Sequence, residues 1–149
     1  MTAQELAEAT RDAMWDDDHA SQGLGMEVLA IGPGSATLSM KVRRDMLNGH
    51  ELCHGGLIAT LADSTFAFAC NAYNELTVAS GFDINLLAAA RLGDVLTATA
   101  SEVSKAGRTG VYDIQVRNQH GDAIAAFRGR SYTMKGKPVV QGLPMGKVL

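Results

Sequence analysis

A long apolar segment in the middle of the chain places the strongest constraint on the fold. From Leu57 to Cys70 the sequence reads "LIATLADSTFAFAC", with few polar positions. A helix that is apolar on nearly all sides has to be enclosed by the rest of the protein. The segment is too short to cross a bilayer, and it contains a carboxylate, Asp63. It therefore predicts a central helix covered by other elements.

Strand-like segments flank this helix on both sides. Two precede it and are joined by the turn sequence "GPG", and four follow it, the last three joined by "AGRTG" and "NQHGD": residues 26–31, 35–42, 77–87, 94–103, 109–118 and 123–133. Antiparallel strands joined by short turns need no crossover helices. The order predicts an α+β fold in which an antiparallel sheet curls around the long helix.

The length of 149 residues suits one domain with a single core. We expect this domain to span residues 1–134 and to begin with a short amphipathic helix over residues 4–15. Residues 135–149 contain three glycines and two prolines, and we expect them to form a loose tail.

Composition excludes several classes of function. A formal net charge of −3 argues against binding to nucleic acid, which usually requires a basic face. The first fifteen residues lack the apolar stretch of a secretory signal, so we expect a soluble protein with no membrane partner. The two cysteines form no CxxC pair, which predicts reduced thiols and a cytoplasmic location.

Asp63 is the residue that most needs explaining. It belongs to a narrow polar stripe along the apolar helix, formed by Thr60, Asp63, Ser64 and Asn71. A carboxylate in such a place is usually paired, at an interface, or catalytic. A hydrogen bond to a neighbouring loop is the alternative to a catalytic role, and the helix pattern alone leaves both open.

The start of the helix favours a catalytic role for this segment. Gly55 and Gly56 lie where the first N–H groups have no partner within the helix and where the helix dipole is positive. Glycine leaves such N–H groups open to a ligand, as in an oxyanion hole. A tight turn into the helix would also require glycine, and the two interpretations are compatible.

Three segments carry a resemblance to a known family. "LNGHELCHGGLIATLADSTFAFACN", "GDVLTATA" and "GRTGVYDIQVRNQHGDAIAAFRG" resemble the hotdog-fold acyl-CoA thioesterases, most closely the phenylacetic acid degradation (PaaI) type. The resemblance covers roughly residues 10–133. It implies a hotdog fold, hydrolysis of aryl-acetyl-CoA (phenylacetyl- or hydroxyphenylacetyl-CoA) to the free acid and coenzyme A, and no cofactor or metal.

The resemblance also implies roles for individual residues. Asp63 matches the catalytic carboxylate, and the Gly55 N–H matches the donor that polarises the thioester carbonyl. Asn48 matches an assisting amide, and His54 matches a histidine that helps to hold the loop.

Further residues are expected to contact the substrate, and here the chain departs from its relatives. The expected contacts are Gly56, Ser80, Gly81 and Arg108. Related enzymes carry at position 81 a serine that supports the attacking water, and Ser80 is its neighbour. Ala88 and Ala89 replace an Arg-Pro pair of many relatives, which removes one expected contact with coenzyme A.

Other catalytic or metal-binding assignments have weaker support in the sequence. Cys53 beside His54 suggests a nucleophile and base, but sequence neighbours rarely face one another and no orienting acid follows. His50 and His54 alone make a poor metal site, so no metal is expected. The rival functions are a non-catalytic acyl-CoA-binding module, a hotdog dehydratase, and a thioesterase for short or medium acyl chains in another pathway.

Helix geometry predicts an oligomer. Gly55 and Asp63 are eight residues apart, so about 12 Å apart along a helix at 1.5 Å per residue. An oxyanion donor and a base must both lie within about 3 Å of the reacting groups. Two antiparallel helices in a two-fold dimer would bring Gly55 of one copy to Asp63 of the other. We therefore expect a homodimer with shared sites, or a homotetramer built as a dimer of dimers, as the resemblance also implies.

Overall fold

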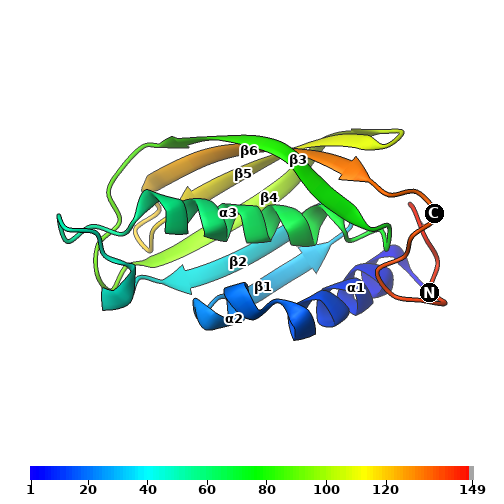
Figure 1. Ribbon diagram of the computed structural model, residues 1–149, viewed down its shortest axis with the longest axis horizontal. Helices are drawn as coiled ribbons and strands as arrows, with labels where there is room; N and C mark the ends of the chain where they lie inside the picture. The colour runs from blue at the N-terminus through cyan, green and yellow to red at the C-terminus, as the bar shows by residue number, and fades with distance from the viewer. Residues whose placement is uncertain (148–149) are drawn as a thin grey trace.

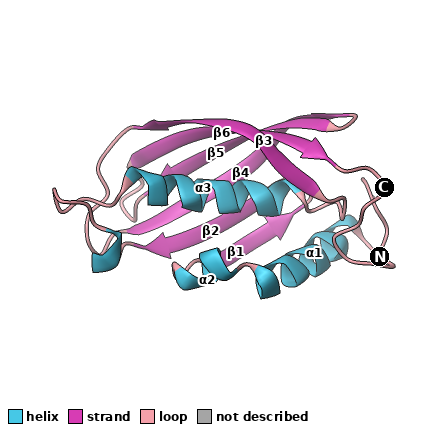
Figure 2. Ribbon diagram, in the orientation of Figure 1, coloured by secondary structure: helices cyan, strands magenta, loops and turns pink. Residues whose placement is uncertain are grey.

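The structure, a computed structural model, describes residues 1–147. The helices are α1 (Ala3–Asp17), α2 (His19–Gly23), the 3₁₀ turn η1 (Arg44–Met46) and α3 (Gly55–Cys70). The strands are β1 (Glu27–Gly32), β2 (Ser35–Lys41), β3 (Thr77–Leu86), β4 (Val95–Ala106), β5 (Thr109–Arg117) and β6 (Ala123–Thr133). Figures 1 and 2 show α3 lying along the inner face of a curved sheet, with α1 and α2 beside β1.

All six strands form one antiparallel sheet in the order β1-β2-β4-β5-β6-β3. The sheet is open, with β1 and β3 as its two edges. This arrangement confirms the predicted α+β fold, in which a curled antiparallel sheet wraps a long central helix. The short helix α2 was not predicted. It follows α1 directly, and the Asp18 side chain caps it by accepting a hydrogen bond from the Ser21 N–H at 3.0 Å.

The core forms where α3 meets the sheet. Phe66 of α3 is 1% exposed and packs against Tyr112 and Phe127, with ring centroids 5.6 Å and 6.1 Å away. The glycine at position 129 in β6 makes this contact possible, because a Cβ there would lie 2.8 Å from the Phe66 ring. Within residues 1–147 no helix is long and apolar enough to span a membrane.

A β-bulge in β3 decides which of its side chains face α3. The register shifts between Ala79 and Gly81, so Ser80 is an extra residue. Beyond the bulge Phe82 stacks on the buried Phe127 at 4.7 Å, while Asp83 points outward and pairs with Arg130 at 2.8 Å. Without the extra residue the alternation would turn Asp83 toward the core.

The C-terminal segment differs from the loose tail that we expected. Residues 135–147 contain neither helix nor strand. They are nevertheless anchored, because the buried side chain of Asn74 forms hydrogen bonds with the backbone of Val140, Leu143 and Pro144. Positions 148 and 149, the last two of the predicted tail, lie outside the described residues.

Candidate active site

Asp63 lies halfway along α3 at the edge of a largely apolar cavity. The cavity has a volume of about 350 Å³ and is lined by Met14, Asp63, Phe66, Ala67, Cys70, Asn71, Leu76, Thr77, Val78, Ala79 and Val139. Within residues 1–147 the Asp63 carboxylate has no hydrogen-bond partner, and no fully buried side-chain oxygen is left unpaired. The carboxylate is therefore half-buried, accessible to solvent, and free to bind a water molecule or a substrate.

The surroundings of Asp63 favour its neutral form. Burial is the main cause that raises the pKa of the Asp63 carboxyl, and the negative charge of Asp18 raises it further. A chain of hydrogen bonds connects the start of α2 to α3. The Ser21 hydroxyl lies 2.7 Å from the Asp18 carboxylate and 2.8 Å from the hydroxyl of Ser64, the residue after Asp63. A carboxylate with a raised pKa and no partner is typical of a functional group.

The four residues of the polar stripe on α3 do not form one solvent-exposed face. The Thr60 hydroxyl donates to the Gly56 carbonyl at 2.8 Å, and Ser64 bonds to Ser21 of α2. Asn71 is buried, and its side chain bonds both the N–H and the carbonyl of Thr77 at 2.9 Å. Of the four polar residues, Asp63 alone has no hydrogen bond from its side chain within the described part of the chain.

The loop before α3 orients the Asn48 amide. The side-chain oxygen of Asn48 accepts hydrogen bonds from the backbone N–H groups of His50 at 2.9 Å and Leu52 at 3.2 Å. These bonds hold the carboxamide in place and leave its NH₂ group without a partner among residues 1–147. The N–H groups of Gly55 and Gly56 are also unpaired in the described chain, as expected for the first turn of a helix.

Asn48 and Gly55 share a second cavity, of about 360 Å³, near the end of β3. Its lining residues are Asn48, Leu52, Cys53, Gly55, Ile58, Leu86, Leu87, Ala88, Ala89 and Ala90. Glycine at position 55 leaves room for Leu86, since a Cβ there would lie 2.5 Å from Leu86 Cδ1. Asp63 does not line this cavity, so one copy of the chain keeps the carboxylate and the N–H donors in separate places.

His54 supports the loop through its backbone. Its N–H donates to the Met46 carbonyl at 2.9 Å, and its carbonyl accepts from Leu57 at 3.0 Å and Ile58 at 3.3 Å. The imidazole is exposed and caps no N–H of the helix. The expected role of His54 in holding the loop therefore needs only its main chain in this structure.

The expected substrate contacts are spread over the molecule. Gly56 is exposed in the first turn of α3, and Arg108 lies in the β4–β5 turn with Nη1 3.5 Å from the Tyr132 hydroxyl. The Ser80 hydroxyl donates to the Arg130 carbonyl at 3.2 Å, and the Arg130 guanidinium lies where a Gly81 side chain would project. None of these residues lines either cavity, so their assignment to the substrate stays a prediction.

The cysteines and histidines offer no alternative site. The Cys53 thiol lies 3.7 Å from the His54 carbonyl oxygen, and burial raises its pKa, which disfavours the reactive thiolate. Burial likewise raises the pKa of Cys70 to about 12. In the described part of the chain, no three His, Cys, Asp or Glu side chains are grouped as a metal ion would require.

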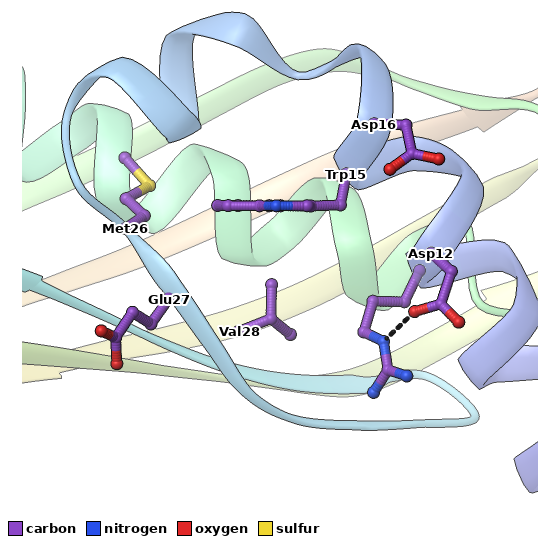
Figure 3. Close-up of a pocket in the computed structure, with 7 residues that line it drawn as sticks. Asp12, Trp15, Asp16, Met26, Glu27 and Val28 are labelled. Carbon is purple, nitrogen blue, oxygen red and sulfur yellow. Dashed lines mark hydrogen bonds and ion pairs between the residues drawn. The ribbon is translucent and has the colours of Figure 1, made fainter.

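A third cavity, between α1 and β1, is larger than the other two, but its lining is too acidic to bind a ligand that carries phosphates. It has a volume of about 420 Å³ and is lined by Arg11, Asp12, Trp15, Asp16, Met26, Glu27 and Val28. Figure 3 shows the Trp15 ring beside Val28, with the carboxylates of Asp12, Asp16 and Glu27 around them. Asp12 forms an ion pair with Arg11 at 2.9 Å. An acidic rim of this kind repels the phosphates of a nucleotide-like ligand.

Comparison with known proteins gives the family. The thioesterase superfamily model matches residues 50–125, which include Gly55 and Asp63. The chain belongs to the thioesterase superfamily. This thioesterase is 42% identical over 124 residues to the acyl-coenzyme A thioesterase PaaI of Escherichia coli K12, covering 83% of this chain and 89% of that one.

Solved structures confirm the hotdog fold of this thioesterase. The E. coli PaaI structure superposes with a TM-score of 0.89 at 39% identity, covering 91% of this chain and 99% of that chain. A PaaI mutant of Thermus thermophilus gives 0.74 at 34% identity, covering 77% and 98%. A thioesterase protein of Streptococcus pneumoniae, solved with coenzyme A, gives 0.72 at 26% identity, covering 75% and 90%. The chain is a thioester hydrolase.

Two residues that line the Asp63 cavity were not predicted from the sequence. Met14 was expected only as part of an amphipathic helix, and Val139 lies in the segment expected to be loose. Among the apolar residues of α3, Phe66 lines the cavity, whereas Leu57 and Phe68 do not. Phe68 instead packs against Trp15, with ring centroids 6.3 Å apart. No local pattern marks Val139, because its neighbours in space are remote in the sequence.

Proposed function

We propose that this thioester hydrolase acts on acyl-CoA and prefers aryl-acetyl groups such as phenylacetyl, releasing the free acid and coenzyme A. The observation that carries the proposal is the Asp63 carboxylate, free of partners within the described chain at the edge of an apolar cavity. The PaaI enzyme of E. coli and the coenzyme A-bound thioesterase of S. pneumoniae support the acyl-CoA class.

Asp63 acts on the thioester carbonyl in its ionised form. As a general base it removes a proton from water, which attacks the carbonyl, and the C–S bond then breaks. As a nucleophile it attacks the carbonyl itself and breaks the C–S bond, forming a mixed anhydride that water then cleaves. In both routes coenzyme A leaves as the thiolate and takes up the proton that water loses. Both routes place negative charge on the carbonyl oxygen. The Gly55 N–H and the Asn48 NH₂ group are two donors suited to that oxyanion.

A two-fold dimer completes this site. Since Asp63 and the pair Asn48–Gly55 line different cavities of one chain, the complete site takes Asp63 from one copy and the donors from the other. The edge strand β3 suits the contact. One edge of β3 pairs with β6, and its other edge has no strand partner among residues 1–147. Three apolar residues of β3, Val78, Phe82 and Leu86, are exposed. Pairing β3 with its copy would cover this edge and set the two α3 helices antiparallel.

The size and lining of the Asp63 cavity favour an aryl-acetyl group. A protein cavity of about 150 Å³ lined by apolar side chains binds benzene. The Asp63 cavity is about 350 Å³ and is lined largely by apolar groups, including Met14, Phe66 and Leu76. An acetyl group would leave most of this space unfilled and would gain little from apolar contact.

We expect kcat/KM for phenylacetyl-CoA to exceed that for acetyl-CoA by at least about tenfold, since a single methylene in an apolar pocket already discriminates by that factor. The measurement is a hydrolysis screen across aryl, short, medium and long acyl-CoA thioesters. Equal or better values for acetyl-CoA would contradict the aryl-acetyl preference. Binding without turnover of any thioester would instead favour the non-catalytic acyl-CoA module.

The pH profile should respond to Asp18. Because Asp63 works ionised and its pKa is raised, activity falls as the pH drops through that pKa. Asp18→Asn removes one cause of the raised pKa and keeps a side chain that can cap α2, so the acid limb of kcat/KM against pH should move to lower pH. Asp17→Asn, at the exposed end of α1, is the matched control and should leave the limb in place. An acid limb that is the same in Asp18→Asn and wild type would rule out this influence.

A further inference from the structure

The C-terminal segment forms part of the wall of the Asp63 cavity. Val139 is half-buried and lines the cavity together with Asp63, Leu76 and Val78. The segment lies outside residues 50–125, the part that the superfamily model matches. It therefore adds to the cavity a surface from outside the part of the chain that the superfamily model matches.

One side chain holds this segment in place. The Asn74 carboxamide donates to the carbonyls of Val140 at 3.0 Å, Leu143 at 3.3 Å and Pro144 at 3.1 Å, and it accepts from the Val140 N–H at 2.7 Å. Asn74 is 0% exposed and has a φ of 59°, a conformation that asparagine tolerates better than most residues. These four bonds satisfy a buried amide that would otherwise destabilise the fold.

Backbone hydrogen bonds anchor both ends of the same segment. The Leu76 N–H donates to the Lys137 carbonyl at 2.8 Å, and the Gly146 N–H donates to the Tyr73 carbonyl at 2.9 Å. Residues 73–76, which connect α3 to β3, thus hold residues 137–146 across the end of the cavity. The arrangement fixes Val139 although its segment has no regular secondary structure.

We propose that residues 137–146 form a strap that sets the size of the acyl group this enzyme accepts, with Val139 as a specificity-determining residue and Asn74 as its positioning residue. The inference rests on the proposed function, because it takes the Asp63 cavity as the acyl site. With the thioester carbonyl at Asp63, the acyl chain extends between Phe66 and Leu76 toward Val139. The ligand class is an apolar acyl group whose far end contacts the strap.

The test compares the ratio of kcat/KM for phenylacetyl-CoA to kcat/KM for acetyl-CoA in wild type, Val139→Phe and Val103→Phe. The larger side chain at position 139 fills space that the aryl ring needs, so the ratio should fall at least about tenfold. Val103 is 53% exposed on β4, outside the cavity, and the same substitution there should leave the ratio unchanged. An unchanged ratio in Val139→Phe, or an equal fall in Val103→Phe, overturns the strap.

A second variant tests the positioning role. Asn74→Gly accepts the positive φ but removes the carboxamide, so the strap should detach. The KM for phenylacetyl-CoA should rise more than kcat falls, and the amide of Val140 should lose its protection from hydrogen exchange. Loss of that protection with an unchanged ratio overturns the proposal. If wild-type turnover depends on Asp63 but the ratio does not change in Val139→Phe, only the strap is refuted. If the wild type turns over no acyl-CoA at all, the proposed function is refuted as well.

Discussion

Replacing Asp63 with asparagine is expected to lower kcat for acyl-CoA hydrolysis at least about a hundredfold, the loss typical of a positioned base or nucleophile. Asparagine keeps the shape of the side chain but can neither take a proton from water nor attack the thioester. The measurement is steady-state hydrolysis of phenylacetyl-CoA by wild type and variant at equal protein concentration.

The same substitution should leave the protein folded and no less stable. Burial raises the pKa of Asp63, so in the folded state the ionised form is disfavoured relative to the unfolded chain. The ionised carboxylate thus lowers stability at pH values above that pKa, and a neutral amide removes this effect. We expect a melting temperature equal to or above that of wild type. Asp16→Asn, exposed near the end of α1, is the control and should retain full activity. A folded Asp63→Asn protein with near wild-type turnover would refute the catalytic assignment.

Mixing two inactive variants should restore activity. Asp63→Ala lacks the carboxylate and Asn48→Ala lacks the amide donor, so each homodimer has two defective sites. If the site takes Asp63 from one copy and Asn48 with Gly55 from the other, a mixed dimer carries one site with both residues and one with neither. Random association makes about half of the dimers mixed, so co-refolding should return about a quarter of wild-type activity.

Distinct affinity tags on the two variants allow the mixed dimers to be isolated and counted. Purified mixed dimers should show about half of the wild-type activity per dimer. As a control, co-refolded Asp63→Ala and Asp63→Asn should recover none, because every site in those mixtures lacks the carboxylate. Failure of the Asp63→Ala and Asn48→Ala pair, in a preparation shown to contain mixed dimers, would mean that each copy builds its own site.

Much of the fold and part of the site could be predicted from the sequence. The apolar pattern of residues 57–70 and the alternation in the strands are local signals, and they led to the observed helix-in-sheet architecture. Asp63 was conspicuous as a carboxylate in an apolar helix, and Gly55 as a glycine at a helix start. The loop before α3 was less accessible. Asn48 was singled out only through the family resemblance, and the loop also depends on remote contacts such as the hydrogen bond from the Cys53 N–H to the Ala90 carbonyl at 2.8 Å.

The β3 strand shows where such reasoning ends. Its bulge at Ser80 changes the face on which every later side chain lies, and it is apparent only from the pairing with β6. The stripe on α3 shows the same limit. Asn71 belonged to it by spacing, yet its side chain is buried against Thr77.

The sequence by itself determined the architecture and marked Asp63 as an unusual carboxylate in an apolar helix, because helix and strand periodicity and the chemistry of a single side chain are local properties. Only the tertiary structure decided what surrounds Asp63: Asp18 from the start of α2, Met14 from α1, and Val139 from the C-terminal strap. Asn74 and Val140, whose bonds hold that strap, are 66 residues apart in the chain. Contacts at such a separation leave no repeating pattern in the sequence, since they depend on how the whole chain closes around one core.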